Sequence, residues 1–272
     1  MRTSKILSKI RAGKVARICS TGHFLPFFPK LAAHFGYDGV WVDAEHRAFD
    51  PREAQALLAF HHLANIDCIW RPPTLEKTAL YRLLEDGATG LMIPHVSTVE
   101  KAKALVQAVK FPPMGDRGLD GAGLDADFYT HSSLSYPQHV NRETLLVVQI
   151  ETQEAVENIE AIASVPGVDV LFIGPGDLSL RLGCSPAPID PKMMEVQKRV
   201  AKAAEMNGKA WGRPVANIEG VEAIQRLGAR FIALGSDFGA IHSHLSSMSS
   251  QFDSALGEGL PIVAKEITSV IP

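Results

Sequence analysis

The sequence predicts a (β/α)8 barrel, the TIM-barrel class of α/β proteins, formed as a single domain over residues 1–272. Eight short apolar runs alternate with stretches that have helical periodicity or helix start signals. Most of the runs are almost continuously apolar, as in strands of a parallel sheet covered on both faces. The chain has 272 residues, a length typical of a one-domain barrel. A doubly wound open sheet is the alternative architecture, but it usually has fewer strands.

The expected strands follow one another along the chain, and no stretch between them has the composition of a domain linker. They are residues 15–19, 39–43, 67–71, 90–94, 145–150, 168–173, 209–212 and 230–234. Because each run is too short for a typical helix and most are rich in apolar residues, we interpret them as strands.

The segments between the strands contain clear helix boundary signals. Asp50 and Asp190 are each followed by proline. The aspartate can cap the helix, and proline is favourable at the first helical position. The helix that begins after Asp190 is expected to end at the Asn-Gly pair at 207–208. Further helices are expected over residues 75–85, 98–109, 154–164 and 218–227.

Two segments depart from this regular alternation. A connection over residues 111–143 is rich in Gly, Pro, Asp and Ser and separates the fourth helical segment from the fifth strand. Long connections inside a compact domain are usually functional or disordered, so we expect an active-site lid or a substrate loop. The tail over residues 244–272 is longer than a last barrel helix needs. Its apolar end makes it a candidate for subunit contacts and for exchange between subunits.

Composition and charge argue against several classes of protein. The chain is 46% hydrophobic and 21% charged, as in ordinary globular proteins. Its formal net charge is −3 and it has no Lys/Arg run, so a nucleic-acid partner is not expected. No segment reaches the ~18–20 apolar residues of a membrane span, and the charged first residues lack the apolar stretch of a signal peptide. With three cysteines and no C-x-x-C pair, we expect a cytoplasmic protein without disulfides.

Ionisable side chains follow the expected strands at the places where a barrel enzyme carries its active site. In (β/α)8 enzymes the catalytic residues gather at the C-terminal ends of the strands. The polar residues at these ends are Asp43, Glu45, His46, Arg71, His95, Gln149, Glu151 and Asp177. Their clustering predicts an active site from the residues alone.

Glu151 and Asp177 are the candidate metal ligands. Both lie just before expected helices, so helix capping is the structural alternative. Two carboxylates on adjacent strand ends can converge on one point, and Mg²⁺ favours one or two protein carboxylates together with substrate oxygens and water. We therefore favour a metal site. Gly176, in the Gly-Pro-Gly-Asp turn, makes either a tight turn or a backbone contact to a substrate carboxylate, and these two roles are compatible.

His46 and Arg71 are the candidate catalytic side chains. Imidazole titrates near neutral pH, so His46, beside Glu45 and near Asp43, is a candidate general base. A structural histidine that hydrogen-bonds to these acids is the alternative. A guanidinium at the end of a mostly apolar strand costs free energy unless it pairs with an acid or an anionic substrate, and we expect Arg71 to do so. His95 is a weaker candidate for the same pocket.

Several common catalytic motifs are absent from the sequence. The segment GLDGAG is a weak phosphate signal, and no G-x-G-x-x-G follows an expected strand, which argues against a dinucleotide site. The sequence has neither a G-x-S-x-G elbow nor a G-x-x-x-x-G-K-[ST] loop. Serine hydrolases and P-loop enzymes are therefore not expected.

Five stretches of the chain match one protein family in the right order. They are YDGVWVDAEHRAFD, WRPP, the segment from DGATGLMIPHV to MGDRG, the segment from VQIETQEAV to GPGDLSLRLG, and ARFIALGSDFGAI. Together they span residues 37–241, and a joint match of this length is highly specific. On these motifs the chain resembles the HpcH/HpaI family of class II pyruvate aldolases, which includes 4-hydroxy-2-oxoheptanedioate aldolase and 2-keto-3-deoxy sugar-acid aldolases.

The resemblance implies a role for each candidate residue. Glu151 and Asp177 would bind a divalent metal (Mg²⁺, Mn²⁺ or Co²⁺), which pyruvate chelates through its carboxylate and keto oxygens. His46 would act as the base, and Arg71 would steady the enolate oxygen. The expected substrate-binding residues are Arg71, Gln149, the backbone of Gly176 and Asp177.

One position departs from the family pattern. In the family, an acid that raises the basicity of the histidine lies in a Leu-Asp-x-Gly-Ala stretch, whereas this chain reads LEDGA over residues 84–88. Glu85 takes the place of that aspartate. Asp86 and Asp43 are the alternative partners for His46.

Taken together, the residues and the resemblance predict a divalent-metal-dependent class II aldolase. It would cleave a 4-hydroxy-2-oxo acid to pyruvate, or a close 2-oxo acid, and an aldehyde through a metal-chelated enolate, and would catalyse the reverse addition. Abstracting a proton next to a keto group needs a base and an electrophile for the developing oxyanion, and the candidate residues supply both. A lyase of the same fold that acts on a CoA thioester or decarboxylates a 2-oxo acid is the alternative. An inactive binding or scaffold barrel is a third reading.

The expected partners are a small 2-oxo acid and an aldehyde. We expect aldehyde specificity to come from residues 111–143, from the segment STGHFLPFF after Cys19, and from a neighbouring subunit. Members of the family commonly form hexamers, so the resemblance implies a homo-oligomer.

Overall fold

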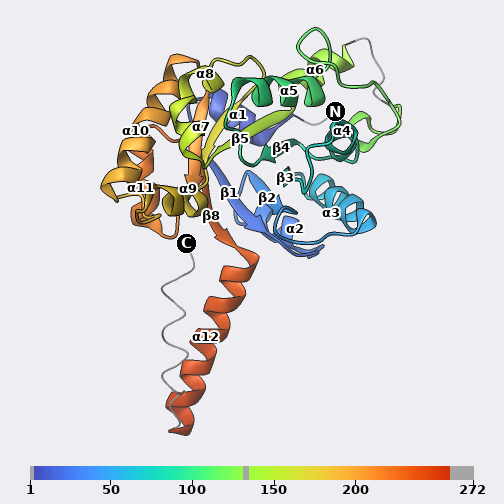
Figure 1. Cartoon of the computed structure of the whole chain (residues 1–272). Helices are drawn as coiled ribbons and strands as arrows, with labels where there is room; N and C mark the ends of the chain where they lie inside the picture. Colours follow the sequence, from blue (N-terminus) through green and yellow to red (C-terminus); the bar gives the residue numbers. More distant parts are fainter. Residues whose placement is uncertain (1–2, 131–134, 258–272) are drawn as a thin grey trace.

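The computed structural model describes residues 3–130 and 135–257. Its strands are β1 (Ala16–Thr21), β2 (Gly39–Asp43), β3 (Asp67–Arg71), β4 (Gly90–Ile93), β5 (Leu145–Ile150), β6 (Val170–Ile173), β7 (Ala210–Pro214) and β8 (Phe231–Ser236). Neighbouring strands pair in parallel, and β8 pairs with β1 to close the barrel (Figure 1). The predicted (β/α)8 class and all eight predicted strands are confirmed.

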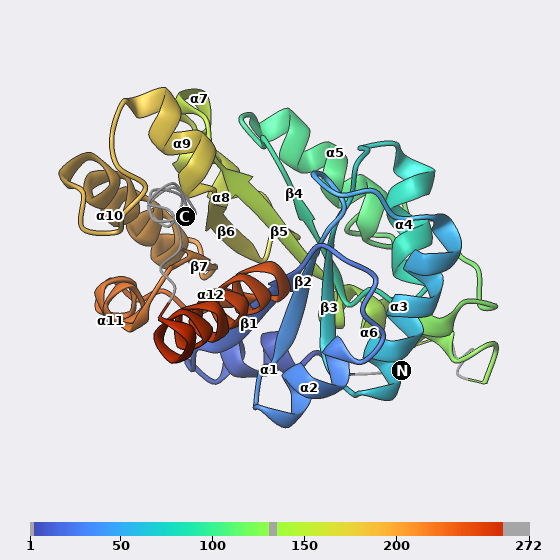
Figure 2. The same cartoon turned by 90° about the horizontal axis from the view of Figure 1, so that it is seen from below.

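Helices surround the strands, as the view along the barrel in Figure 2 shows. They are α1 (Lys5–Arg11), α2 (Phe28–His34), α3 (Pro51–Leu63), α4 (Lys77–Glu85), α5 (Val99–Val109), α6 (Tyr136–Glu143), α7 (Gln153–Glu157), α8 (Ile159–Ala163), α9 (Pro175–Leu182), α10 (Pro191–Met206), α11 (Ile218–Gln225), α12 (Asp237–Leu256) and the 3-10 helix η1 (Leu124–Ala126). The predicted capping signals are confirmed. Asp50 forms a capping box with Glu53, and Asp190 accepts hydrogen bonds from the first turn of α10.

Some helices differ from the sequence-based expectation. The helix expected over residues 154–164 is divided into α7 and α8 at Asn158, whose ψ of 10° interrupts the helical backbone. Residues 111–143 are not an irregular loop throughout, because they contain η1 and α6. Helices α1, α2 and α6 were not expected. Each has only seven or eight residues, which is too short for a hydrophobic period to stand out.

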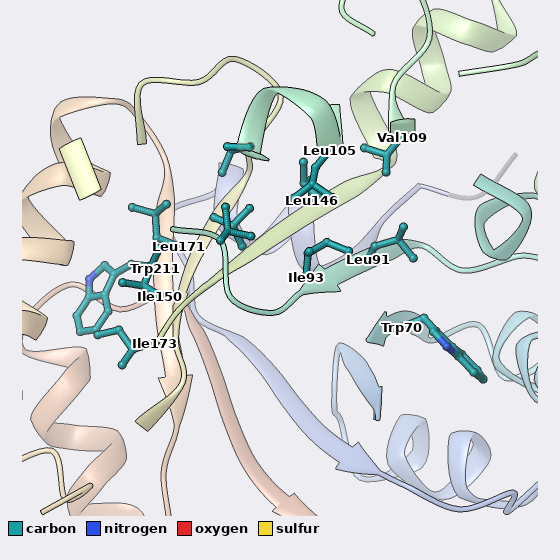
Figure 3. Packing of buried hydrophobic residues seen from close by; sticks show 14 of the residues in the cluster. Trp70, Leu91, Ile93, Leu105, Val109, Leu146, Ile150, Leu171, Ile173 and Trp211 are labelled. Carbon is teal, nitrogen blue, oxygen red and sulfur yellow. The ribbon is translucent and has the colours of Figure 1, made fainter. Parts of the chain in front are cut away.

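Two layers of apolar side chains pack on the opposite faces of the strands. Alternate residues point into the barrel, where Ile18, Ile69, Val147, Phe172 and Phe231 form the inner cluster. The other residues point outward and pack against the helices, as Figure 3 shows for a set that includes Trp70, Leu91, Ile150, Leu171 and Trp211. This period of two decides which polar side chains at the strand ends face the barrel axis.

Strands β7 and β8 approach each other closely at one glycine. A β-carbon on Gly212 would lie 1.6 Å from the carbonyl oxygen of Phe231. No other residue could occupy this position without moving the strands apart, so the close contact between β7 and β8 depends on this glycine.

Helix α1 closes the end of the barrel at which the strands begin. Ile6 is fully buried and belongs to the inner cluster. Its backbone N–H donates to Oδ2 of Asp67 at 2.9 Å, and Ser4 donates to the same oxygen at 2.7 Å. Because Asp67 is the first residue of β3, these bonds fasten α1 across the base of the barrel. Within the described residues, α1 and the inner cluster therefore close the base of the barrel.

Helix α12 projects away from the barrel instead of packing along it (Figure 1). Of its 20 residues only Asp237, the first, is buried. Within the described residues, no helix combines the length and apolar character needed to cross a membrane. Residues 258–272, the end of the tail for which the sequence predicts subunit contacts, lie outside the described part of the chain.

Candidate active site

Four of the predicted site residues lie at the end of the barrel where the strands finish. Asp43 and Arg71 are the last residues of β2 and β3, and Gln149 and Glu151 lie at and just beyond the end of β5. Arg71 and Gln149 follow Ile69 and Val147 of the inner cluster by two residues. Their side chains therefore point toward the barrel axis. The strand period thus brings residues from distant parts of the sequence to one opening.

The guanidinium of Arg71 is the centre of this arrangement. Its Nε and Nη2 bind the two carboxylate oxygens of Asp43 at 3.0 and 2.9 Å, and its Nη1 lies 2.9 Å from Oε2 of Glu45. Nη1 also donates to Oε1 of Gln149 at 3.4 Å. The Arg71 side chain is 8% exposed, and two carboxylates compensate its positive charge. The prediction that Arg71 pairs with an acid is confirmed. The geometry fixes the guanidinium in one orientation.

An aromatic ring forms the floor beneath this guanidinium. The carbon Cζ of Arg71 lies 4.8 Å from the centroid of Trp41, which in turn packs edge to face on Phe172 at 5.7 Å. Sequence reasoning missed Trp41, although the period of two in β2 places it on the same face as Asp43. The ring contributes cation–π attraction and keeps water from the inner side of the guanidinium.

Trp41→Leu is expected to lower kcat about tenfold with little change in KM. The variant loses about 1–2 kcal/mol of cation–π stabilisation and lets the guanidinium tilt. Steady-state kinetics below the unfolding temperature measure this effect. The control is Trp70→Leu, which removes an outward-facing, buried ring next to Arg71 and should lower Tm without lowering kcat. Equal losses of kcat in the two variants would refute a positioning role for Trp41.

Asp43 serves both the arginine and the turn that carries His46. Burial raises the pKa of Asp43, but the hydrogen bonds and positive charge of Arg71 outweigh burial, so the pKa lies below its ordinary value. Its Oδ1 also accepts from the backbone N–H groups of Glu45 at 3.1 Å and His46 at 3.3 Å. Asp43 thus contacts the backbone of His46, while the ring of His46 lies 3.6 Å from Oε2 of Glu45. The His46 side chain is 55% exposed at the opening.

Glu151 is a buried carboxylate in a negatively charged setting. Its Oε1 accepts from the backbone N–H of His95 at 2.7 Å, and its Oε2 accepts from Nε2 of Gln149 at 3.2 Å. Burial raises the pKa of Glu151, and the negative charges of Asp177 and Glu45 raise it further. The nearby His95 lowers that pKa but does not offset the increase. Such a site favours an added positive charge.

Two glycines near Glu151 have different roles. A β-carbon on Gly174 would lie 2.2 Å from Oε2 of Glu151, so this glycine makes room for the carboxylate. The corresponding position on Gly176 is open, with no atom within 4 Å. The absence of a side chain at Gly176 is therefore not required by packing. Its backbone lies in the first turn of α9, where N–H groups are available to an anion.

Asp177 lies in the first turn of α9, at the outer edge of the site. Its Oδ1 lies 2.9 Å from Nη1 of Arg181, and the same nitrogen donates to the carbonyl oxygen of Glu151 at 3.2 Å. The Asp177 side chain is 44% exposed. Arg181 thus connects the two predicted metal ligands, although it was not identified from the sequence.

His95 also belongs to the site. It has a positive φ of 53°, which is uncommon outside glycine, and its Nδ1 lies 3.3 Å from Oε1 of Glu151. Its Nε2 lies 4.0 Å from Oε1 of Glu45. The backbone carbonyl of His95 accepts from Nζ of Lys101 at 2.9 Å. Burial lowers the pKa of Lys101, and the charges of Glu151 and Glu45 oppose that decrease.

Glu85 is not brought to His46 by the fold of the chain. It is the last residue of α4, which runs from the end of β3 back toward the start of β4, so it lies at the opposite end of the barrel from Arg71. Burial raises the pKa of Glu85, and Arg117 lowers it. The alternative Asp86 accepts from Gln55 at 3.1 Å in the same region. Among the described residues, the acid next to the His46 ring is Glu45.

Glu151 and Asp177 fit a divalent cation on the chemistry of their donors. Both offer carboxylate oxygens, which hard cations such as Mg²⁺ and Mn²⁺ prefer. Burial is the main cause of the raised pKa of Glu151, and the negative charge of Asp177 adds to it; a cation between the two carboxylates would offset both effects. Only two carboxylates would bind it, which leaves coordination positions for a substrate and water.

Comparison with known proteins shows that most of the chain is similar to proteins named as aldolases. The family model "HpcH/HpaI aldolase/citrate lyase" matches residues 26–243. The chain is similar to a hydroxypyruvate/pyruvate aldolase from Pseudomonas aeruginosa, with 31% identity over 92% of each chain. It is similar to a 2-dehydro-3,6-dideoxy-6-sulfogluconate aldolase from Pseudomonas putida, with 34% identity over 81% of this chain and 83% of that protein. The crystal structure of an HpcH/HpaI aldolase from Desulfitobacterium hafniense DCB-2 matches with a TM-score of 0.84 and 29% identity, over 94% of this chain and 97% of that one.

Proposed function

The chain belongs to the HpcH/HpaI aldolase/citrate lyase family and is a carbon–carbon lyase, and from this premise we propose that it is a divalent-metal-dependent class II aldolase. It cleaves a 4-hydroxy-2-oxo acid to pyruvate, or a close 2-oxo acid, and an aldehyde, and it catalyses the reverse addition. The observation that carries this proposal is the fixed guanidinium of Arg71, which lies beside Gln149 at the end of the barrel where the strands finish.

The reaction requires residues that transfer one proton and residues that stabilise one negative charge. In cleavage, the hydroxyl on C4 loses its proton, the C3–C4 bond breaks, and the electron pair moves to the oxygen of the 2-oxo group. Arg71 stabilises the charge on that oxygen, because its guanidinium is held in place before the reaction begins. His46, whose ring is exposed at the opening, accepts the proton from the C4 hydroxyl and then donates it to C3 of the enolate, which completes pyruvate. Gln149 and the backbone N–H groups near Gly176 orient the carboxylate of the 2-oxo acid.

Glu151 and Asp177 would hold the divalent metal. When bound, such an ion acts as a Lewis acid toward the oxygens of the 2-oxo acid and favours charge development there. The negative surroundings of Glu151 support this role. Mg²⁺, Mn²⁺ and Co²⁺ are the candidate ions.

Exchange of the pyruvate methyl protons tests the proposed function without knowledge of the aldehyde. Purified protein is incubated with pyruvate in deuterated water, with Mn²⁺ or Mg²⁺ or with a chelator, and the methyl signal is followed by NMR. We expect the signal to decrease with a divalent ion and to persist with the chelator. A persistent signal under both conditions would contradict the enolate mechanism. Subsequent incubation with pyruvate and assorted aldehydes, read by mass spectrometry, identifies the second substrate.

We also propose that the protein is a homo-oligomer whose contacts include α12. The exposed large apolar residues of this helix are spaced by three, four or seven positions, which makes one continuous stripe of Phe238, Ile241, Leu245, Phe252 and Leu256. A projecting helix with one buried residue gains little stability from its own chain. A second copy of the chain offers the same apolar stripe, so the two helices can bury each other.

Leu245→Glu is therefore expected to reduce the molar mass of the assembly measured by light scattering. A charge in the middle of the apolar stripe would be desolvated on association and would weaken it by more than ~2 kcal/mol. Ser250→Glu is the matched control, because Ser250 is exposed and lies on the opposite side of the same helix. An unchanged mass for Leu245→Glu would exclude this face from the subunit contact.

A further inference from the structure

The loop after β1 carries a histidine whose ring is held by a buried aspartate. Nδ1 of His23 lies 2.7 Å from Oδ2 of Asp237. The same oxygen accepts from the hydroxyl of Thr21 at 2.8 Å and from the backbone N–H of Gly22 at 3.2 Å. The Asp237 side chain is 4% exposed, whereas the His23 side chain is 49% exposed. A buried carboxylate thus fixes one edge of an imidazole ring that otherwise reaches the surface.

Helix capping does not account for these contacts of Asp237. An acid in the first turn of a helix ordinarily stabilises the helix dipole. Here the N-cap is Ser236, whose hydroxyl accepts from the backbone N–H of Gly239 at 2.9 Å. Oδ1 of Asp237 accepts from the adjacent backbone N–H of Phe238 at 2.7 Å. The remaining oxygen, Oδ2, is left for the loop after β1.

This contact determines how the His23 ring presents its two nitrogens. An ionised carboxylate only accepts hydrogen bonds, so Nδ1 must donate the proton. In the neutral imidazole, Nε2 then carries the lone pair and is an acceptor. Within residues 3–130 and 135–257, Asp237 is the partner of this ring, and it binds through Nδ1. The half-exposed ring therefore offers Nε2 to a ligand at the surface.

The loop that carries His23 lies at the end of the barrel where Arg71 and Glu151 lie, beside the loop after β2. Strands β1 and β2 pair in parallel up to Thr21, so the loops that follow them emerge side by side. A β-carbon on Gly22 would lie 2.8 Å from Cγ of Arg47, the residue after His46. Figure 2 shows the chain after β1 next to the start of α12, on the face where the strands end. His23 is therefore a neighbour of the loop that carries the expected base.

We propose that His23, positioned by Asp237, is a specificity-determining residue that accepts a hydrogen bond from a hydroxyl group on the aldehyde half of the substrate. The proposal rests on the proposed function, in which the 2-oxo acid binds beside Arg71 and Glu151 and the aldehyde half extends toward the rim. A hydroxyl group on the carbon next to the aldehyde matches the acceptor Nε2. An aldehyde with a methyl group in that place leaves Nε2 without a partner, which a site built for a hydroxyl group disfavours.

A pair of aldehydes of the same size tests this proposal. Glycolaldehyde and propionaldehyde differ in a hydroxyl group against a methyl group, and kcat/KM is measured for the addition of pyruvate to each. His23→Phe keeps a ring but removes both nitrogens, and because the side chain is half exposed the variant should fold. His34→Phe is the control, since His34 is exposed and lies in the last turn of α2, at the base of the barrel. Deuterium exchange of pyruvate alone reports the enolate step in every variant.

We expect the ratio of kcat/KM for glycolaldehyde to kcat/KM for propionaldehyde to be five- to tenfold lower in His23→Phe than in the unmodified protein. This factor corresponds to the free energy of one hydrogen bond. The lower preference should result from a higher KM for glycolaldehyde. The rates of propionaldehyde addition and of pyruvate exchange should stay unchanged. Asp237→Asn should show the same shift to a smaller extent, because Oδ1 of an asparagine can still accept from Nδ1. An unchanged preference, or an equal loss with both aldehydes, would overturn the proposal. Loss of pyruvate exchange in the unmodified protein would instead refute the proposed function.

Discussion

Replacement of Arg71 by lysine is expected to lower kcat/KM for aldol addition by about a hundredfold to a thousandfold, the cost of losing one preorganised oxyanion donor. A lysine has a single ammonium group, which cannot bind Asp43, Glu45 and Gln149 in the geometry of the guanidinium. Because lysine keeps the positive charge, a lower kcat/KM would show that the orientation of the guanidinium matters for the reaction. Steady-state kinetics with pyruvate and the best aldehyde from the substrate screen measure it.

The same substitution should also lower the stability of the fold. Glu45 loses its nearest partner, the guanidinium nitrogen at 2.9 Å, and a mostly buried carboxylate without that hydrogen bond costs about 1–3 kcal/mol. Arg199→Lys is the control, because Arg199 pairs with Glu160 on the exposed surface and should change neither property. Activity of Arg71→Lys within a few fold of the unmodified protein would remove Arg71 from the reaction.

Glu151→Gln should strongly weaken divalent metal binding and, with it, slow the exchange of pyruvate methyl protons. The substitution keeps the size of the side chain but removes one of two charged ligands, and a neutral amide is a weak ligand for a hard cation. Titration calorimetry with Mn²⁺ should show a Kd raised at least about a hundredfold. The variant should be at least as stable as the unmodified protein, because burial and neighbouring negative charges already disfavour the ionised form of Glu151.

The matched control for this experiment is Glu154→Gln, three residues further along the chain. Glu154 is exposed in the first turn of α7, so its loss should leave both the Kd and the exchange rate unchanged. If Glu151→Gln binds Mn²⁺ as tightly as this control does, Glu151 is not a metal ligand. If metal binding persists and only the exchange is lost, the carboxylate acts on the substrate instead.

The strands could be predicted from the sequence because burial on both faces makes them continuous apolar runs. Their order and closure followed from the regular alternation with helices. The short helices α1 and α6 could not be predicted, since a helix of two turns depends on tertiary contacts such as those of Ile6 with the inner cluster. The division between α7 and α8 also lacks a proline or glycine signal in the sequence.

The site residues that could be predicted from the sequence are those that lie directly at the ends of strands. Arg71, Gln149 and Glu151 come together because their strands end at one opening, and sequence position was sufficient to find them. The contacts around them required the structure. The left-handed backbone of His95 and the place of Glu45 between Arg71 and His46 depend on three strands at once. Glu85 was selected by motif position alone, and the path of α4 carries it to the other end of the barrel.

Among the described residues, α1 closes the base of the barrel, so the site faces solvent on one side, and this imposes an order on the reaction that we propose. In the proposed reaction, the 2-oxo acid binds beside Arg71 and the aldehyde half lies between it and solvent. In cleavage the aldehyde must therefore leave before pyruvate can, and in synthesis pyruvate must enter first. Product inhibition would then be asymmetric, with pyruvate competing directly against the 4-hydroxy-2-oxo acid and the aldehyde acting on a later enzyme form.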